Sequence, residues 1–137
     1  MSALVADASV VAKCILPESG SDHARVLIHD AESAVAPANI HAECANAVWK
    51  LVHRGLMTRE SAALALLDLE TIPISLQSLR RLTPAAFALA LEYDHPIYDC
   101  YYLAAAIQHD AALATADVRL FDLAQRAGLG ERAILVR

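Results

Sequence analysis

Four acidic residues lie at positions from which they could act together. Asp7 ends a short apolar run, Asp117 follows another, and Glu43 and Asp99 come near the start of stretches with helical periodicity. Carboxylates gathered within a few ångströms repel one another, and divalent cations relieve that repulsion. Oxygen ligands alone favour Mg²⁺ or Mn²⁺ over Zn²⁺. Two such ions about 4 Å apart can clamp the attacking and leaving oxygens of a phosphodiester and activate water.

Each of these acids also has an ordinary structural interpretation. Asp7 and Asp117 could cap the helices that follow them. Glu43 and Asp99 could be acids of a first helical turn, where the helix dipole favours negative charge. The catalytic hypothesis therefore depends on whether residues far apart in the sequence meet in space.

Short apolar runs alternate with amphipathic stretches along the chain. The predicted strands are 4–6, 34–36, 72–76, 112–115 and 133–136, and the predicted helices are 8–15, 22–31, 40–54, 59–69, 85–92, one that begins after Pro96, and 118–127. This alternation predicts an α/β domain with a mostly parallel central sheet flanked by helices. Ligands bind such sheets beyond the carboxyl ends of the strands, where the strand order reverses, so we expect the four acids to converge there.

Polar residues and prolines predict where several elements begin. Asn39 is expected to cap the helix 40–54, and Ser21 or Asp22 the helix before it. Thr83 is expected to cap the helix 85–92, with a proline at its first position. Pro73 restricts the strand 72–76 to a sheet edge or a strand start. Ser9 and Thr115, two residues from Asp7 and Asp117, are hydroxyls that could orient carboxylates.

Composition limits the class of protein. The 137 residues predict a single domain over 1–137, and 57% apolar residues suffice for one core. No apolar run reaches the length of a membrane span, and no secretory signal is visible.

Cys14, Cys44 and Cys100 are expected to be small buried hydrophobes. Because they form no disulfide pattern, a cytoplasmic location is expected. The net charge of −5 argues against a non-specific nucleic-acid coat protein but not against an enzyme whose acids hold metal.

Four segments together resemble the acidic motifs of the PIN-domain nucleases. They are residues 5–9 (Val-Ala-Asp-Ala-Ser), Glu43 with Asn46, residues 98–104 (Tyr-Asp-Cys-Tyr-Tyr-Leu-Ala) and residues 113–120 (Leu-Ala-Thr-Ala-Asp-Val-Arg-Leu). The chain length and the last two segments are similar to those of VapC-type toxins of bacterial toxin–antitoxin pairs. The resemblance covers nearly the whole chain and implies a single PIN-like domain.

The resemblance implies a metal-dependent endoribonuclease, a hydrolase that forms a homodimer and is inhibited by a cognate antitoxin whose tail enters the cleft. It implies an acidic site of Asp7, Glu43, Asp99 and Asp117. Asp7 and Asp99 would be direct Mg²⁺ (or Mn²⁺) ligands, while Glu43 and Asp117 act partly through water. Hydrolysis by metal-activated water does not need the RNA 2′-hydroxyl, so it would leave a 5′-phosphate and a 3′-hydroxyl.

Cations and aromatic residues near the acids have two interpretations each. The cations Lys13, Lys50, Arg54 and Arg119 could contact phosphates or could be ordinary surface charge. Lys50 follows Glu43 by seven residues, so both share one helix face. The tyrosines at positions 98, 101 and 102 could stack on bases, although core packing is the stronger expectation.

Other functions remain as alternatives. His41-Ala42-Glu43 fits half of the zinc deaminase signature, but the Pro-Cys-x-x-Cys half is absent. A non-enzymatic interaction module could use the acids for a structural cation or to accept a phosphoryl group, although the adjacent acids and late lysine of a receiver domain are missing. A PIN-like domain could also be a nuclease that is not a toxin.

Overall fold

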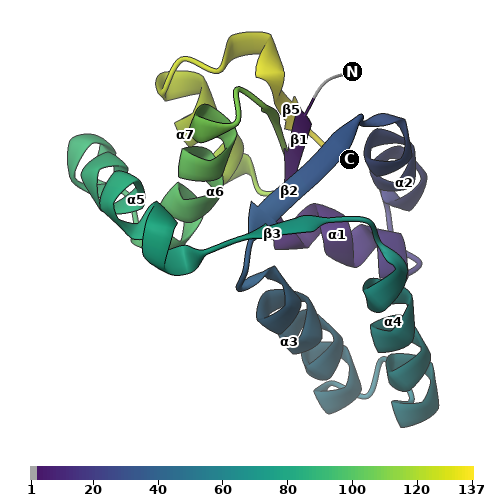
Figure 1. The fold of residues 1–137 in the computed structure, drawn as a ribbon. Coiled ribbons are helices and arrows are strands. Elements are labelled where there is room, and N and C mark those ends of the chain that lie inside the picture. The colour runs from purple at the N-terminus through teal and green to yellow at the C-terminus, as the bar shows by residue number, and fades with distance from the viewer. Residues whose placement is uncertain (1–2) are drawn as a thin grey trace.

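The computed structural model describes residues 3–137, which form a five-stranded sheet with helices packed around it (Figure 1). The strands are β1 (Ala3–Ala6), β2 (Ser33–Pro37), β3 (Ser75–Gln77), β4 (Ala112–Thr115) and β5 (Ala133–Leu135). The helices are α1 (Ala8–Ile15), α2 (Ser21–Asp30), α3 (Ile40–His53), α4 (Arg59–Thr71), α5 (Leu79–Tyr93), α6 (Ile97–Gln108) and α7 (Val118–Arg126), with a 3₁₀ turn η1 (Gly130–Arg132). The predicted α/β architecture is confirmed.

The strand order is β3-β2-β1-β4-β5, and every neighbouring pair is parallel. From β1 the chain builds outward to β2 and β3, and then crosses back to β4 on the other side of β1. The order therefore reverses between β1 and β4, where Ala6 pairs with Ala114 and the Asp7 amide donates to the Ala114 carbonyl at 3.1 Å. In open parallel sheets this reversal is where ligands bind.

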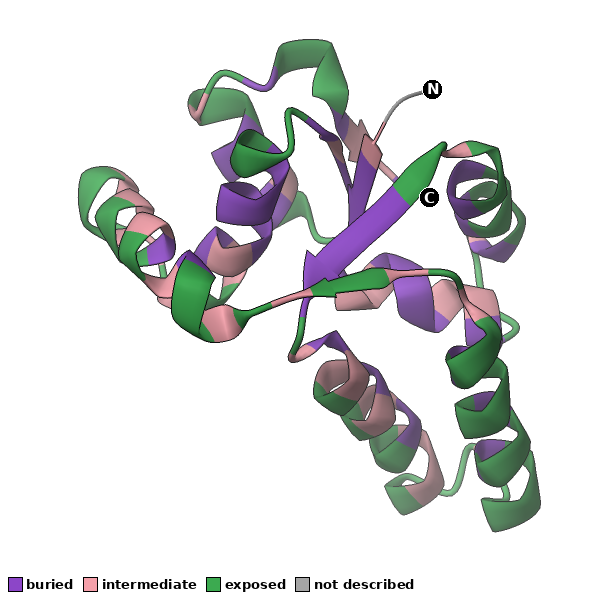
Figure 2. Cartoon of the chain, viewed as in Figure 1, coloured by how far each residue is buried: buried purple, intermediate pink, exposed green. Residues whose placement is uncertain are grey.

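Helices cover both faces of the sheet and bury its centre. In Figure 1, α5, α6 and α7 lie on one side of the sheet and α1 and α2 on the other, while α3 and α4 pack against α1. Figure 2 shows that burial is concentrated in β1, β2 and α6, which packs between the sheet and α5. The buried alanines 104, 105 and 106 of α6 allow that helix to approach the sheet closely.

The third strand is shorter than predicted and lies at the sheet edge. It begins at Ser75, where it pairs with Val35, instead of at residue 72. Pro73 precedes the ladder, and the Ile74 amide donates to the Ile72 carbonyl at 2.9 Å in a tight turn. Of the two positions expected from Pro73, a sheet edge or a strand start, the edge is observed, with Pro73 itself two residues before the strand.

Two predicted helix starts are wrong. Helix α5 begins at Leu79, and the Ser78 hydroxyl accepts the Arg81 amide at 3.3 Å, whereas the Thr83 hydroxyl donates to the Leu79 carbonyl at 2.7 Å. Helix α2 is preceded by Gly20 with φ of 87°, so neither Ser21 nor Asp22 is its cap. In both cases an upstream residue already begins the helix.

The cysteines are free thiols: Cys44 and Cys100 are buried and Cys14 is half-buried. Burial raises the pKa of the Cys44 thiol to about 12, so this thiol stays protonated. Within residues 3–137 no helix is both long enough and apolar enough to span a membrane.

Candidate active site

Asp7 lies between the end of β1 and the start of α1 and is only 6% exposed. Its Oδ1 accepts the Ser9 hydroxyl at 2.5 Å and the Val10 amide at 3.1 Å, so it does cap α1. Its Oδ2 accepts the Thr115 hydroxyl at 2.5 Å from the end of β4. The capping interpretation of Asp7 is therefore correct. Capping does not account for the two further hydrogen bonds that Asp7 accepts from hydroxyl groups, because a helix cap does not need them.

Burial raises the pKa of the Asp7 carboxyl well above that of an ordinary aspartate. Desolvation raises its pKa from 3.8 to about 6, although hydrogen bonds from Ser9, Thr115 and the Val10 amide oppose that rise. The nearby Asp99 carboxylate raises the pKa further. A nearby cation would therefore stabilise the ionised form of Asp7.

Glu43 lies in the first turn of α3, where two donors hold one of its oxygens. Its Oε1 accepts the Asn39 amide at 2.8 Å and the Tyr102 hydroxyl of α6 at 2.9 Å. Among the described residues, Oε2 has no hydrogen-bond partner. Burial raises the pKa of Glu43, the Tyr102 hydrogen bond opposes that rise, and the charge of Asp99 adds to it.

Two residues beside Glu43 donate hydrogen bonds to its carboxylate, and one of them, Asn39, differs from its predicted role. Asn39 precedes α3, but its side chain makes no capping hydrogen bond because it turns to Glu43. Tyr102 is buried, and burial next to Glu43 raises the pKa of its hydroxyl well above the ordinary range. Tyr102 therefore stays protonated and donates to the carboxylate. The four-residue spacing of Asn39 and Glu43 was a signal for this contact in the sequence.

Asp99 lies in the first turn of α6, as predicted. Its Oδ2 is 2.8 Å from Nε2 of His95, and its side chain is 30% exposed. Its carboxylate accepts no backbone amide of α6, and the residue before the helix, Pro96, provides no side-chain cap. Asp99 is therefore not explained by helix capping.

Asp117 lies at the exposed margin of the same region. Its Oδ1 caps α7 by accepting the Arg119 amide at 2.9 Å. Its own amide donates to the Thr115 hydroxyl oxygen at 2.9 Å, and the Ala116 amide donates to the Ser9 hydroxyl oxygen at 2.9 Å. The hydroxyls of Ser9 and Thr115 thus connect the ends of β1 and β4.

These contacts bring the four acids to one edge of the sheet. The charge of Asp99 acts on both Asp7 and Glu43, and Asp117 is joined to Asp7 through Thr115. This is the convergence that the strand order predicts, because β1, β4 and the starts of α3 and α6 all meet beyond the carboxyl ends of the strands.

The donor set fits an open site for a hard cation. Within residues 3–137, no three His, Cys, Asp or Glu side chains are grouped so that together they could hold a metal ion. Mg²⁺ is usually bound by one or two carboxylates together with water and substrate phosphate, so a closed protein cage is not required. The uncommitted oxygens of Asp99 and Glu43 and the raised pKa of Asp7 suit such an ion.

A cavity of about 430 Å³ opens beside Glu43. Glu43 is the one of the four acids that lines it, together with Ser9 and Ala116, and Glu18 lies in its lining as well. The basic side chains in its lining are Lys13, Lys50 and Arg54. Glu43 and Lys50 lie on one face of α3, as their seven-residue spacing predicts, and Arg54 directly follows the helix as its C-cap residue.

Comparisons with known proteins agree with this geometry. The PIN domain family model matches residues 4–126. The chain belongs to the PIN-domain family. It is 32% identical over 119 residues to Ribonuclease VapC3 of Pyrobaculum aerophilum, which covers 85% of this chain and 91% of that protein. The fold is similar to the crystal structure of PAE2754 from the same organism, with a TM-score of 0.74, 21% identity, and coverage of 98% of this chain and 84% of that one.

The predicted core packing of the three tyrosines is correct for part of this PIN domain only. The three tyrosines have different environments: Tyr102 is in the core, Tyr101 is half-buried and bonded to the Thr83 hydroxyl at 2.7 Å, but Tyr98 is 72% exposed. Core packing is therefore wrong for Tyr98.

The zinc deaminase alternative fails, because the family is different and no zinc ligand set exists among residues 3–137.

The raised pKa of Asp7 predicts a specific pH dependence of stability without metal. The folded state holds this proton up to about pH 6, whereas the unfolded chain releases it near pH 3.8. Stability from this group therefore falls as pH rises from about 4 to 6 and stays low above that window. Asp7→Asn keeps a cap and has no charge, so we expect it to be more stable than wild type at pH 7 by up to about 3 kcal/mol, with little difference at pH 4.

Chemical denaturation at several pH values in the presence of a chelator measures this difference. Asp68→Asn, on the exposed side of α4, is the control and should follow the wild-type curve. A large loss of stability for Asp7→Asn at pH 7 would contradict the expectation and assign Asp7 a mainly structural role.

Proposed function

We propose that this PIN domain is a metal-dependent endoribonuclease that hydrolyses RNA phosphodiester bonds. The observation that carries the proposal is the buried Asp7 carboxylate, held by Ser9 and Thr115 beside the charge of Asp99, in a member of this family. The similarity to a protein named Ribonuclease VapC3 over most of both chains supports RNA as the substrate.

Each acid has a defined part in this proposal. Asp7 and Asp99 hold Mg²⁺ or Mn²⁺ directly, and Glu43 and Asp117 contribute partly through water. A divalent ion bound there lowers the pKa of water and stabilises the charge that develops on the phosphate. Ser9 and Thr115 keep the Asp7 oxygens oriented, and Asn39 and Tyr102 do the same for Glu43. The 2′-hydroxyl has no role, so the products carry a 5′-phosphate and a 3′-hydroxyl.

The basic side of the cavity is the proposed path for the RNA backbone. Lys50 and Arg54 are exposed and form no ion pair within residues 3–137, so both are available to phosphates. Lys13 is less free, because its Nζ donates to the Ser19 carbonyl at 2.6 Å and lies 3.4 Å from Glu18. Arg119 is exposed beside Asp117 and forms no ion pair among the described residues.

We further propose that the chain is a cytoplasmic toxin of a type II toxin–antitoxin pair that forms a homodimer. The VapC name of its relative supports this role. A second cavity, of about 800 Å³, shares Leu16, Glu18 and Leu51 with the basic cavity and is lined by Leu56 and Leu64, which are 71% and 64% exposed. This apolar surface is where we place the antitoxin, whose tail could then continue into the active site.

A ribonuclease assay tests the activity. Wild type should cleave single-stranded RNA only with Mg²⁺ or Mn²⁺, and chelator should abolish cleavage. Asp7→Asn and Asp99→Asn should each lose more than about 100-fold in kcat/KM, beyond the 10–100-fold typical of residues that only support a ligand. Equal cleavage by wild type and variants would place the activity elsewhere. Metal binding without cleavage would favour an interaction module.

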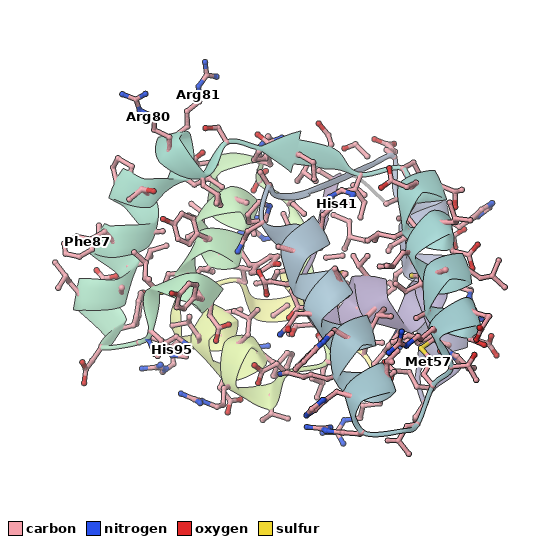
Figure 3. All side chains as sticks on the ribbon, turned by 90° about the horizontal axis from the view of Figure 1, so that it is seen from below. His41, Met57, Arg80, Arg81, Phe87 and His95 are labelled. Atoms are coloured by element: carbon pink, nitrogen blue, oxygen red, sulfur yellow. The ribbon has the colours of Figure 1, made fainter. Side chains whose placement is uncertain are left out.

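Substitutions on α3 test the RNA path. Lys50→Ala/Arg54→Ala should raise the KM for RNA with little change in kcat, and should reduce the slope of log affinity against log salt by about 0.7 per lost phosphate contact. Arg80→Ala/Arg81→Ala removes the same charge from the start of α5, where both side chains point away from the body of the domain (Figure 3). Equal effects of the two pairs would show a general charge effect and contradict the assigned path.

Growth tests the toxin role separately from catalysis. Expression of the wild-type chain should arrest bacterial growth, and Asp7→Asn should not. Co-expression of a small open reading frame adjacent to its gene should restore growth, and the two proteins should co-purify. Ribonuclease activity without growth arrest would make the chain a PIN nuclease that is not a toxin.

A further inference from the structure

We propose that His95 is a positioning residue that orients the Asp99 carboxylate for metal binding. This inference rests on the proposed function, since it assigns a partner to one of the proposed ligands. Its basis is the 2.8 Å contact between Nε2 of His95 and Oδ2 of Asp99, together with the burial of the histidine side chain, which is 8% exposed.

The direction of this hydrogen bond follows from its chemistry. An ionised carboxylate only accepts hydrogen bonds, so Nε2 of His95 carries the proton and donates it, whether the ring is neutral or charged. Oδ1 of Asp99 has no hydrogen-bond partner among the described residues. His95 therefore holds one oxygen on the protein side and leaves the other for a ligand.

The backbone between α5 and α6 sets the position of the histidine. Asp94 ends α5 in the left-handed region with φ of 50°, and the His95 amide donates to the Ala90 carbonyl at 3.1 Å. Pro96, with its restricted φ of −53°, then leads into α6. His95 lies at this turn (Figure 3), and its ring folds onto the first turn of the next helix, four residues along.

Capping of α6 does not account for the contact. A first-turn aspartate usually serves the free amides at the helix start, and here no side chain caps α6. Asp99 instead turns to His95, which lies outside the helix.

His95 also completes a pattern shared with two other acids. Asp7 is held by Ser9 and Thr115, and Glu43 by Asn39 and Tyr102. Hydrogen bonds from such neighbours fix the orientation of ligating carboxylates, and their loss typically costs 10–100-fold in metal affinity or activity. Without His95, Asp99 would be the one partly buried acid of the three with no side-chain donor among residues 3–137.

Two substitutions distinguish the effect of the Nε2–H hydrogen-bond donor of His95 from the effect of its planar ring. His95→Phe keeps a planar ring and removes the N–H, whereas His95→Gln returns an amide N–H near the position of Nε2. We expect His95→Phe to weaken Mn²⁺ binding to the RNA-free protein, measured by electron paramagnetic resonance, by about 10–100-fold, and to lower kcat similarly with KM for RNA within about twofold. His95→Gln should recover both quantities to within a few-fold of wild type.

A double variant tests whether His95 acts through Asp99. If it does, adding His95→Phe to Asp99→Asn should cause no further loss of Mn²⁺ affinity, because the interaction is already gone. Thermal unfolding of each variant in the presence of a chelator checks that the fold is kept. If His95→Phe does not fold, His95→Ala is used in its place.

The outcomes distinguish this inference from the proposed function. Wild-type Mn²⁺ affinity and kcat in His95→Phe, while Asp99→Asn loses both, would overturn the role of His95 and leave the nuclease intact. Equal losses in His95→Gln and His95→Phe, or additive losses in the double variant, would also overturn it. Absence of metal-dependent cleavage by wild type would refute the nuclease, and the Mn²⁺ measurements would still decide the role of His95.

Discussion

The structure depends on a carboxylate buried where two parallel strands end. Asp7 terminates β1, caps α1 and accepts a hydroxyl from the end of β4, so one side chain ties three elements together. Its burial disfavours the charge, and the hydroxyls of Ser9 and Thr115 only partly offset that cost. The fold therefore maintains a site that a cation would stabilise, at the point where the strand order reverses.

Helix packing extends this arrangement to the other acids. Helix α6 carries Asp99 and also supplies Tyr102, which donates to Glu43 on α3. The orientation of one acid is thus coupled to the helix that carries another. The small residues of α6 allow its close approach to the sheet, and this packing brings Tyr102 within reach of α3.

The charge of the whole chain is a poor guide to its surface. The net charge is −5, yet Lys13, Lys50 and Arg54 line the same cavity as Glu43. Cations beside a carboxylate suit the phosphate-carrying ligand of the proposed function. The local distribution of charge, not its sum, is what bears on binding of the proposed RNA substrate.

The sequence alone determined the alternation of strands and helices, and with it the edge at which Asp7 and Asp117 emerge, because a parallel sheet places the carboxyl ends of all its strands together. It also contained the four-residue spacings of Asn39 with Glu43 and of His95 with Asp99. It did not show whether the Asn39 side chain would cap α3 or contact the Glu43 carboxylate. The start of α5 was mispredicted because Ser78 already caps the helix before Leu79, so Thr83 lies inside the helix and its hydroxyl donates to the Leu79 carbonyl. Only the tertiary structure decided that Tyr102 meets Glu43 across 59 residues, since that contact depends on how two helices pack and not on any local preference.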